Sequence, residues 1–452
     1  MKLLFNITHG FQARMLLRTK IAEGLEAAGA TMVVVSPNAD EPYFRAEFDR
    51  PNYVLERMPE HYPKAEKAMV STRAYFLMNP SLGATLHYKR DQYKMHHPWR
   101  YQITRAGNVV LGSVPLLRRA YLNIENTLFS GRELDALLAT HQPDLVVSGT
   151  PGYNAQDAHL LRAARRHGIP TATVMLSWDN LTSKGYMAAE PDHLLVWNAI
   201  MADEARRYHD YQKPIYEVGA AQFDIYGQDL AETDGHAFRE RHGIAADKKL
   251  IVWGTINEAI YPGQLDVLRA FCEELSRPEH QDKVLWVRIH PQTIFGSYAH
   301  LADEHRALAS DRVIIELPPV RSEKLKWDLP RQDMWHLTGL LKAADLLITP
   351  QSTLTIDAAC AGTPIINLAI DKWFARVFKY THYRDVVDSG GVWIVHSMDE
   401  LMRATGQYLA KPELHRDGRE RIVSHQMGQF FGRAGERTAA VLMDLARGAT
   451  TS

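Results

Sequence analysis

The stretch "TPQSTLTIDAACAGTPII", residues 349–366, places polar residues between an apolar strand and a helix of small residues. The preceding run, 345–348, is typical of a strand that is covered on both faces. Ser352 is a favoured helix N-cap, and Gly362 with Pro364 would end the helix that it begins. The pattern predicts one β-α-β unit. Because ligands of open α/β sheets bind at the carboxyl ends of strands, we predict a ligand site at this turn.

The bulk composition sets limits on the fold and the partners. A chain of 452 residues is too long for one ordinary core, so two domains are expected. The formal net charge of -1 provides no overall field for nucleic acid, and we predict no nucleic-acid partner. Two cysteines cannot build a disulfide framework, and no stretch has the features of a signal peptide or a membrane span. We expect a cytoplasmic protein, with peripheral contact to the inner face of a membrane left open.

Strand and helix patterns alternate through both halves of the chain. The polar stretch 222–236, which contains glycine, reads as a linker between two such series. We therefore predict an α/β fold with two Rossmann-like domains facing a cleft. The predicted domains are residues 1–218, residues 219–430, and a C-terminal helical segment, 431–452, that could pack back on the first domain.

A second motif, "VRIHPQ" (287–292), ends another strand of the second domain. His290 can donate a hydrogen bond to a phosphate, and Arg288 can offset its charge. At the helix that follows Ser352, unpaired backbone N–H groups and the helix dipole favour an anion, and the hydroxyls of Ser352 and Thr353 add donors. Each motif also has a structural reading, in which Ser352 only caps its helix and His290 only supports its loop.

Further residues at the same predicted edge complete a nucleotide site. A loop after the first strand of the second domain supplies polar groups. The segment "ELPPV" (316–320) could form a wall for the nucleobase, or it could be only a stiff turn. An acidic residue in the helix that follows Ser352 could face the ribose hydroxyls. The predicted contacts beyond those already named are Gly254, Thr255, Asn257, Gln292, Pro318, Gln351 and Asp357.

Together these motifs resemble a known superfamily. His290-Pro291 and Ser352-Thr353 are similar to the HP and S-[ST] motifs of GT-B glycosyltransferases that use CMP-activated or CDP-activated donors. Examples are bacterial polysialyltransferases, capsule Kdo transferases and CDP-glycerol glycerophosphotransferases. "VGAAQFD" (218–224) resembles the domain junction of GT-B and UDP-GlcNAc 2-epimerase-like proteins. The resemblance implies that the two motifs hold the donor phosphate of a glycosyltransferase in bacterial cell-surface glycan synthesis, with a glycan or lipid-linked acceptor.

The first domain would then supply the acceptor groups. His9 follows the first strand and is the predicted catalytic base, with Asp179 in "LSWDNLTSKG" (176–185) as the alternative. Tryptophan beside a carboxylate and an amide suits a sugar, and a cation in the first turn of a helix suits an anionic ligand. The predicted substrate contacts are Arg14, Trp178, Asn180 and Lys184. Each residue also has a purely structural interpretation: His9 could only support its loop, Trp178 could fill the core, and Arg14 and Lys184 could be solvated cations.

No Asp-x-Asp motif of the kind that holds a metal–nucleotide complex is present, so we expect neither a metal nor a cofactor beyond the nucleotide-activated sugar itself.

The basic, aromatic stretch 87–105 could bind an anionic acceptor, lie on a membrane, or be a solvated face. Three other functions stay open: a UDP-GlcNAc 2-epimerase-like isomerase, a CDP-glycerol-type phosphotransferase, and a non-catalytic GT-B scaffold.

Overall fold

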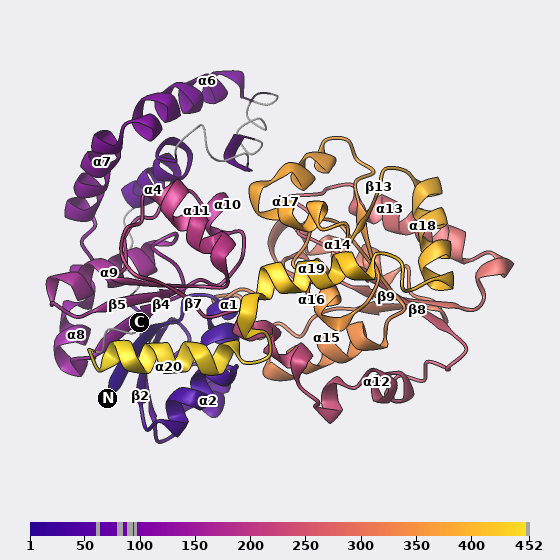
Figure 1. Ribbon diagram of the computed structural model, residues 1–452, viewed down its shortest axis with the longest axis horizontal. Coiled ribbons are helices and arrows are strands. Elements are labelled where there is room, and N and C mark those ends of the chain that lie inside the picture. The colour runs from indigo at the N-terminus through magenta and orange to yellow at the C-terminus, as the bar shows by residue number, and fades with distance from the viewer. Residues whose placement is uncertain (60–63, 79–84, 88–93, 95–96, 449–452) are drawn as a thin grey trace. The chain divides into compact units, whose positions relative to one another are not determined.

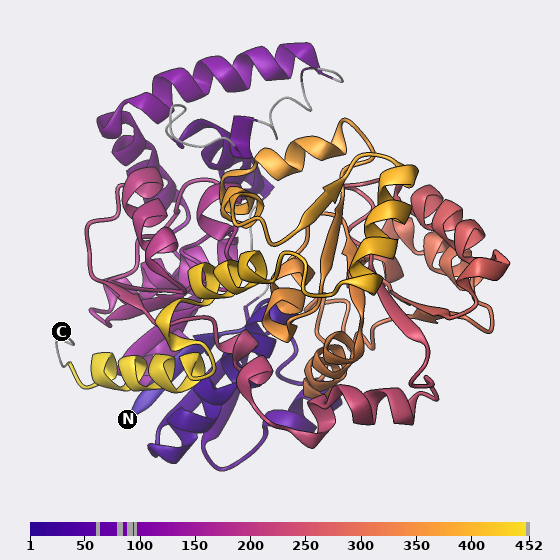
Figure 2. The same ribbon diagram turned by 45° about the vertical axis from the view of Figure 1, so that its right-hand side comes forward.

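The computed structural model describes residues 1–59, 64–78, 85–87, 94 and 97–448 (Figures 1 and 2). They form two compact units. The first comprises Met1–Gln222, Tyr380–His382 and Met427–Ser452, and the second comprises Phe223–Lys379 and Tyr383–Gln426. The segment after Met427 therefore belongs with the N-terminal unit. There, helix α20 (Ala434–Ala446) packs against α2 (Lys20–Ala27).

The first unit is built on a parallel seven-stranded sheet in the order β3-β2-β1-β4-β5-β6-β7. Buried runs such as "TMVVVS" form its centre, as expected when helices cover both faces of a sheet. The strands are β1 (Lys2–Asn6), β2 (Thr31–Ser36), β3 (Tyr53–Arg57), β4 (Leu145–Ser148), β5 (Thr171–Val174), β6 (His193–Val196) and β7 (Ile215–Glu217). The other helical segments are α1 (Gly10–Gln12), η1 (Ala13–Leu17), α3 (Pro42–Phe48), α4 (Lys64–Phe76), α6 (Pro98–Gly107), η2 (Asn108–Gly112), α7 (Pro115–Leu128), η3 (Arg132–Leu134), α8 (Asp135–His141), α9 (Ala155–Arg166), α10 (Asn180–Ser183) and α11 (Ala199–His209).

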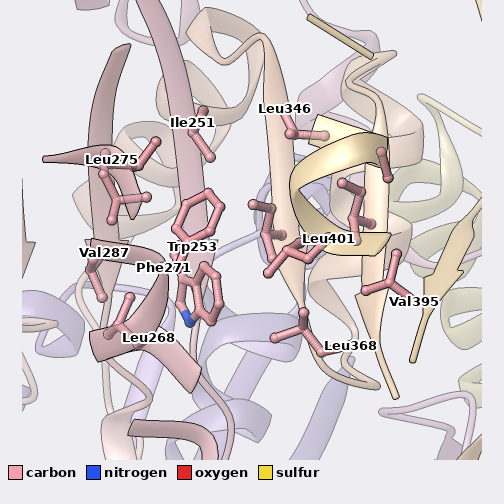
Figure 3. Close-up of a cluster of buried hydrophobic side chains, with 14 of the residues drawn as sticks. Ile251, Trp253, Leu268, Phe271, Leu275, Val287, Leu346, Leu368, Val395 and Leu401 are labelled. Carbon is pink, nitrogen blue, oxygen red and sulfur yellow. The ribbon is translucent and has the colours of Figure 1, made fainter. Parts of the chain in front are cut away.

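The second unit has a parallel six-stranded sheet in the order β10-β9-β8-β11-β12-β13. Its strands are β8 (Lys249–Gly254), β9 (Lys283–Arg288), β10 (Val313–Glu316), β11 (Leu346–Thr349), β12 (Ile365–Leu368) and β13 (Trp393–Val395). Its principal helices are α12 (Gly235–Arg241), α13 (Gln264–Leu275), α14 (His300–Arg306), α15 (Arg331–Ala343), α16 (Leu354–Ala361), α17 (Thr381–Asp388), α18 (Met398–Ala410) and α19 (Arg416–Met427). In Figure 3, side chains from β8, β9 and β11 meet those of α13 and α18 in one buried cluster. Trp253 lies against Phe271 at its centre, with ring centroids 5.2 Å apart.

Both sheets share one topology. The first strand of each unit lies in the middle, with the next two strands on one side and the later strands on the other. The direction of winding therefore reverses between β1 and β4 in the first unit and between β8 and β11 in the second. Loops that leave the carboxyl ends of these strands are the usual ligand positions of doubly wound sheets.

Some helices differ from the sequence prediction for local reasons. The spacing of Leu17, Ile21, Leu25 and Ala28 is that of one continuous helix face, but the helix is broken, because Thr19 caps a new helix through its hydroxyl, which accepts from the amide of Ile21. Residues 114–140 also have a helical sequence pattern, but the helix there is divided. Gly131 has a φ of +74°, and an added Cβ there would lie 2.3 Å from the carbonyl oxygen of His159. The prediction did not include β3, α3, α12, α17 or α19.

Within the described part of the chain, no helix combines the length and the apolar character needed to cross a bilayer.

Candidate functional site

Three loops meet at the carboxyl edge of the second sheet. Gly254, at the end of β8, is paired in register with Arg288 at the end of β9. On the other side of β8, the hydroxyl of Thr349 donates to the carbonyl oxygen of Gly254 over 3.0 Å. A Cβ at Gly254 would lie only 2.4 Å from Cδ1 of Leu354, the first residue of α16. An added side chain at Gly254 would therefore displace the side chain of Leu354, where the β8 loop passes the start of that helix.

Side chains tie the first two of these loops together. The amide of His290 donates to Thr255 Oγ1 over 2.8 Å, and Nδ2 of Asn257 donates to Oε1 of Gln292. The sequence placed these four residues at one edge, and the structure brings them into direct contact. Their role in binding a nucleotide stays a prediction.

His290 has a defined proton arrangement. Its Nδ1 accepts from the amide of Gln292 over 3.2 Å, so the proton of the neutral ring is on Nε2. Burial lowers the pKa of His290 to about 4, which keeps the ring neutral near pH 7. The ring packs edge-on to Trp327, with centroids 5.4 Å apart. His290 can therefore act toward a ligand as a neutral N–H donor rather than as a cation.

Ser352 differs in detail from the prediction. Helix α16 begins at Leu354, and its N-cap is Thr353, whose side chain forms no capping hydrogen bond. The hydroxyl oxygen of Ser352 accepts from the amide of Leu354 over 3.2 Å, which leaves the hydroxyl proton to be donated. Since β9 and β11 flank β8, the strand ends that carry His290 and Ser352 are about 10 Å apart.

Arg288, a predicted nucleotide contact, has internal partners in the structure. Its buried guanidinium donates to Glu316 and, over 2.6 Å, to Asp333. Burial alone would lower the pKa of Arg288, but the two carboxylates raise it above its ordinary value. The arginine is bound internally, where it fastens the end of β9 to β10 and α15.

Other predicted contacts are more enclosed than the sequence suggested. Asp357 is buried and accepts from the hydroxyl of Tyr226 over 2.8 Å, so this oxygen is already occupied by protein rather than open to ribose hydroxyls. Pro318 is buried after β10, and Gln351 is half-buried in the turn before α16. Trp327, next to His290, was not predicted. It lies in a polar segment whose sequence gives no sign of proximity to β9.

In the first unit, His9 leaves the central strand β1 in a short, tightly bonded loop. Its Nδ1 accepts from the amide of Phe11 over 3.1 Å, which again places the proton of the neutral ring on Nε2. Oε1 of Gln12 accepts from the amides of Thr8 and His9, over 2.6 and 3.1 Å. In this arrangement Nδ1 is already engaged and cannot remove a proton from a ligand, so the role of His9 as a base stays a prediction.

A buried carboxylate beneath this loop was missed by the sequence analysis. Asp157, near the start of α9, accepts hydrogen bonds from four side chains: Asn6 at 2.6 Å, Gln12 at 3.1 Å, Thr150 at 2.6 Å and Asn154 at 2.9 Å. Burial raises the pKa of Asp157 to about 6, although all four donors favour the ionised form. The network joins the loops after β1 and β4. Asn154 preceding Asp157 by three residues is the usual N-cap signal and was the only hint in the sequence.

Asp179 lies in the loop after β5, but its environment argues against the predicted role as a base. Its carboxylate accepts from the hydroxyls of Ser177, over 2.6 Å, and Ser183, over 2.5 Å, and lies 3.9 Å from Nζ of Lys184. Burial alone would raise its pKa, but Lys184, His382 and the two hydroxyls hold the pKa well below its ordinary value. Such a carboxylate is a weak proton acceptor at neutral pH.

The predicted sugar contacts of this loop are only partly accessible. Trp178 is 4% exposed and packs edge-on against His382, with centroids 5.3 Å apart, so little of its ring is exposed for a sugar. Asn180 is 5% exposed and begins α10. The sugar contacts of both residues stay predictions. The side chain of Lys184 is half exposed.

Arg14 and Arg18 have different surroundings in η1 and after it. Arg18 is buried and donates to both carboxylate oxygens of Glu47, over 2.7 and 2.9 Å. Within the described residues, Arg14 has no hydrogen-bond or ion-pair partner, and its Nε is buried. Arg14 therefore remains the arginine of this pair that is available to an anionic ligand.

Within the residues that the structure describes, no group of three or more histidine, cysteine or acidic side chains could hold a metal ion. The basic stretch 87–105 falls partly outside these residues, since 88–93 and 95–96 are not described.

Solved structures resemble the whole chain in fold. An S. aureus MnaA–UDP structure matches with a TM-score of 0.59 and 11% identity, covering 100% of this chain and 98% of the other. The Methanocaldococcus jannaschii UDP-GlcNAc 2-epimerase, in complex with UDP-GlcNAc and UDP, matches at 0.54 and 15%, covering 98% and 99%. A glycosyltransferase from Rickettsia africae matches at 0.52 and 9%, covering 100% and 99%.

The chain has the GT-B fold. This confirms the predicted fold class of two Rossmann-like α/β domains. At sequence identities this low, the comparisons show a similarity of fold alone. No protein-family model matches the sequence, and no curated protein matches it.

Proposed function

We propose that the protein is a glycosyltransferase that moves a sugar from a nucleotide-activated donor to a glycan or lipid-linked acceptor in bacterial cell-surface glycan synthesis. The observation that carries the proposal is the convergence of three loops on the carboxyl edge of the second sheet, where His290 presents a neutral N–H donor and Ser352 keeps a hydroxyl proton. Two similar GT-B structures were solved with UDP or UDP-GlcNAc, which supports a nucleotide sugar as the ligand.

In this proposal the second unit binds the donor diphosphate or monophosphate. The Nε2–H group of His290 and the hydroxyls of Ser352 and Thr353 donate to its oxygens, and their hydrogen bonds strengthen as negative charge develops on the leaving nucleotide. The hydrogen bonds Thr255–His290 and Asn257–Gln292 fix the loop that carries the His290 donor before the ligand binds. Fixed donors need no rearrangement during the reaction, which is the source of their catalytic value.

The first unit would bind the acceptor. Arg14, without a partner among the described residues, suits an anionic acceptor group, and His9, in the loop after β1, stays the predicted residue beside the reacting hydroxyl. A general base for the acceptor hydroxyl is assigned to no residue here. His9 would serve only if the loop turned its ring to free Nδ1. We propose no metal and no cofactor besides the donor, and a cytoplasmic location.

A UDP-GlcNAc 2-epimerase-like isomerase is the second candidate, because such an enzyme shares the fold over nearly the full length. Inverting C-2 requires that a C–H bond be broken and remade, which needs a strong, accessible base. At the edge of the first sheet, Asp179 and Asp157 both already accept hydrogen bonds from protein side chains. The base required is therefore unassigned for either reaction, and the two reactions are distinguished by the assay described below.

A thermal-shift titration with CMP, CDP, UDP and GDP tests the nucleotide site, since a ligand that binds only the folded protein raises its melting temperature. At least one nucleotide should stabilise the wild type, and His290→Ala and Ser352→Ala should each reduce that shift. Matched controls are His236→Ala, on an exposed face of α12, and Ser276→Ala, after α13. Equal shifts in all four variants would reject the site.

The reaction itself is tested with the nucleotide sugar that binds best. A transferase releases free nucleotide only when an acceptor is added. An isomerase converts the sugar without an acceptor, keeps the nucleotide attached, and incorporates deuterium at C-2 in heavy water, which NMR detects.

A further inference from the structure

Exposed apolar side chains are concentrated in one segment of the first unit. Among the described residues, thirteen large apolar side chains are exposed, and nine of them belong to residues 99–128. They are Trp99, Ile103, Val109, Val110, Val114, Leu116, Leu117, Ile124 and Leu128. Figures 1 and 2 show α6 and α7 on the outer side of this unit, beyond α4 and α9. We call residues 98–128 the apolar arm.

A surface helix usually turns apolar residues inward and polar residues to water. Tyr121 and Leu122 of α7 do pack inward against a buried cluster, but the helix carries apolar residues on its outer side as well. In α7 the buried residues are Arg118 and Glu125. Arg118 bonds to Gly112 and Asp210, and Glu125 pairs with Arg73 and Arg162. Helix α6 has no buried residue.

Leucine and isoleucine instead occupy the outer side of α7. Leu116, Ile124 and Leu128 are 75%, 55% and 63% exposed. Their spacing of eight and four residues places them, together with exposed Ala120, on one stripe of the helix. An exposed patch of this extent marks an interaction surface.

The charges of the arm indicate what covers it. Arg100, Arg105 and Arg119 are exposed on the same helices, and residues 92–124 contain no acidic side chain. A second copy of the arm would bring like charges together, which disfavours self-association. An anionic bilayer offers an apolar interior for the exposed side chains and negative headgroups for the arginines. Trp99 is 61% exposed, and tryptophan favours the lipid–water boundary.

We propose that the apolar arm docks the protein on the surface of an anionic lipid bilayer, with the stripe of α7 immersed among the lipids and the three arginines at the headgroups. This surface is a binding site for lipid and is independent of the nucleotide site, so the two proposals can fail separately. If both hold, the arm would keep the enzyme at the surface where a lipid-linked acceptor is found.

Vesicle flotation tests the proposal with vesicles of phosphatidylcholine alone and with a phosphatidylglycerol fraction. The wild type should float with the anionic vesicles and dissociate in high salt. Replacing the stripe by Leu116→Ser, Ile124→Ser and Leu128→Ser should lower the partition coefficient by about tenfold or more. The arginine variant, with Arg100, Arg105 and Arg119 changed to Gln, should lose the preference for anionic lipid.

The matched control is Ile200→Ser, an exposed isoleucine on α11, which should bind vesicles like the wild type. Unchanged melting temperatures would show that the variants fold, as expected for exposed positions, and Leu116→Asp is a single-site alternative if the triple variant unfolds. Wild-type protein that binds neither vesicle, or a stripe variant that binds like the wild type, would overturn the proposal. A dimer that the stripe variant abolishes, without vesicle binding, would assign the arm to a second copy instead.

Discussion

Glu204 of α11 provides a sharp test of the electrostatics around the loop after β5. The side chain is buried, and its Oε2 has no hydrogen-bond partner. Burial, then the nearby charges of Asp179 and Asp203, raise the pKa of Glu204 from 4.5 to about 8. Between these two pH values the folded protein holds a proton that the unfolded chain releases.

The sign of the pH dependence follows from this difference. A raised carboxyl pKa stabilises the folded state below pH 4.5, and that stability is lost as pH rises through 8. The difference between a pKa of 4.5 and one of about 8 corresponds to an upper limit on the order of 5 kcal/mol. Because Glu204→Gln carries no such proton, the variant should gain in stability relative to the wild type by up to this amount between pH 4 and pH 9.

Hydrogen exchange of peptides from α11, measured in urea at pH 5, 7 and 9, would follow the unfolding of this unit by itself. Asp203→Asn, at the adjacent exposed position, removes the smallest of the three contributions and should shift the pH profile less than a change at Asp179. Asp179→Asn removes a like charge and should shift the profile of the wild type to lower pH. A Glu204→Gln difference that stays constant over this pH range would refute the reasoning, because it would mean that Glu204 is ionised at pH 7.

Three further predictions concern the loops of the two sheets. Gly254→Ala should destabilise the second unit by about 2 kcal/mol through its clash with Leu354 and weaken nucleotide binding, and Leu354→Ala should restore both in thermal-shift assays. Gln12→Ala should cost about 3 kcal/mol and speed exchange of the Thr8 and His9 amides, whereas nucleotide shifts in the second unit should stay unchanged. Arg288→Met should cost about 4 kcal/mol, because it leaves two carboxylates unpaired, yet the folded fraction should still bind nucleotide; a selective loss of affinity would restore the arginine as a ligand.

The sequence predicted the strands well because most of them are short apolar runs that are buried on both faces, and this pattern depends on local composition alone. It also placed His290, Thr255 and Ser352 at one edge, since parallel strands present their carboxyl ends together. Contacts between residues far apart in the chain could not be predicted from the sequence. Arg288 looks like a phosphate ligand until Glu316 and Asp333, 28 and 45 residues away, are seen to bind it.

The interpretation of the loop after β5 also lacked information about tertiary neighbours. Trp178 has the sequence context of a sugar-stacking residue, but His382, far along the chain, covers it. Asp179 resembles a base until the hydroxyls of Ser177 and Ser183 are found on its oxygens. Local sequence shows which chemical groups are present, whereas their availability depends on tertiary neighbours.

The side-chain ties between the loops after β8 and β9 have a consequence for how specificity can change. Because the hydroxyl of Thr255 holds the backbone of His290 and Asn257 holds Gln292, the edge is shaped before any ligand binds. Under the proposed function, substitutions in the first unit would then alter which acceptor is used while the second unit still binds the same nucleotide. A transferase divided in this way would diversify its products through changes in one half alone.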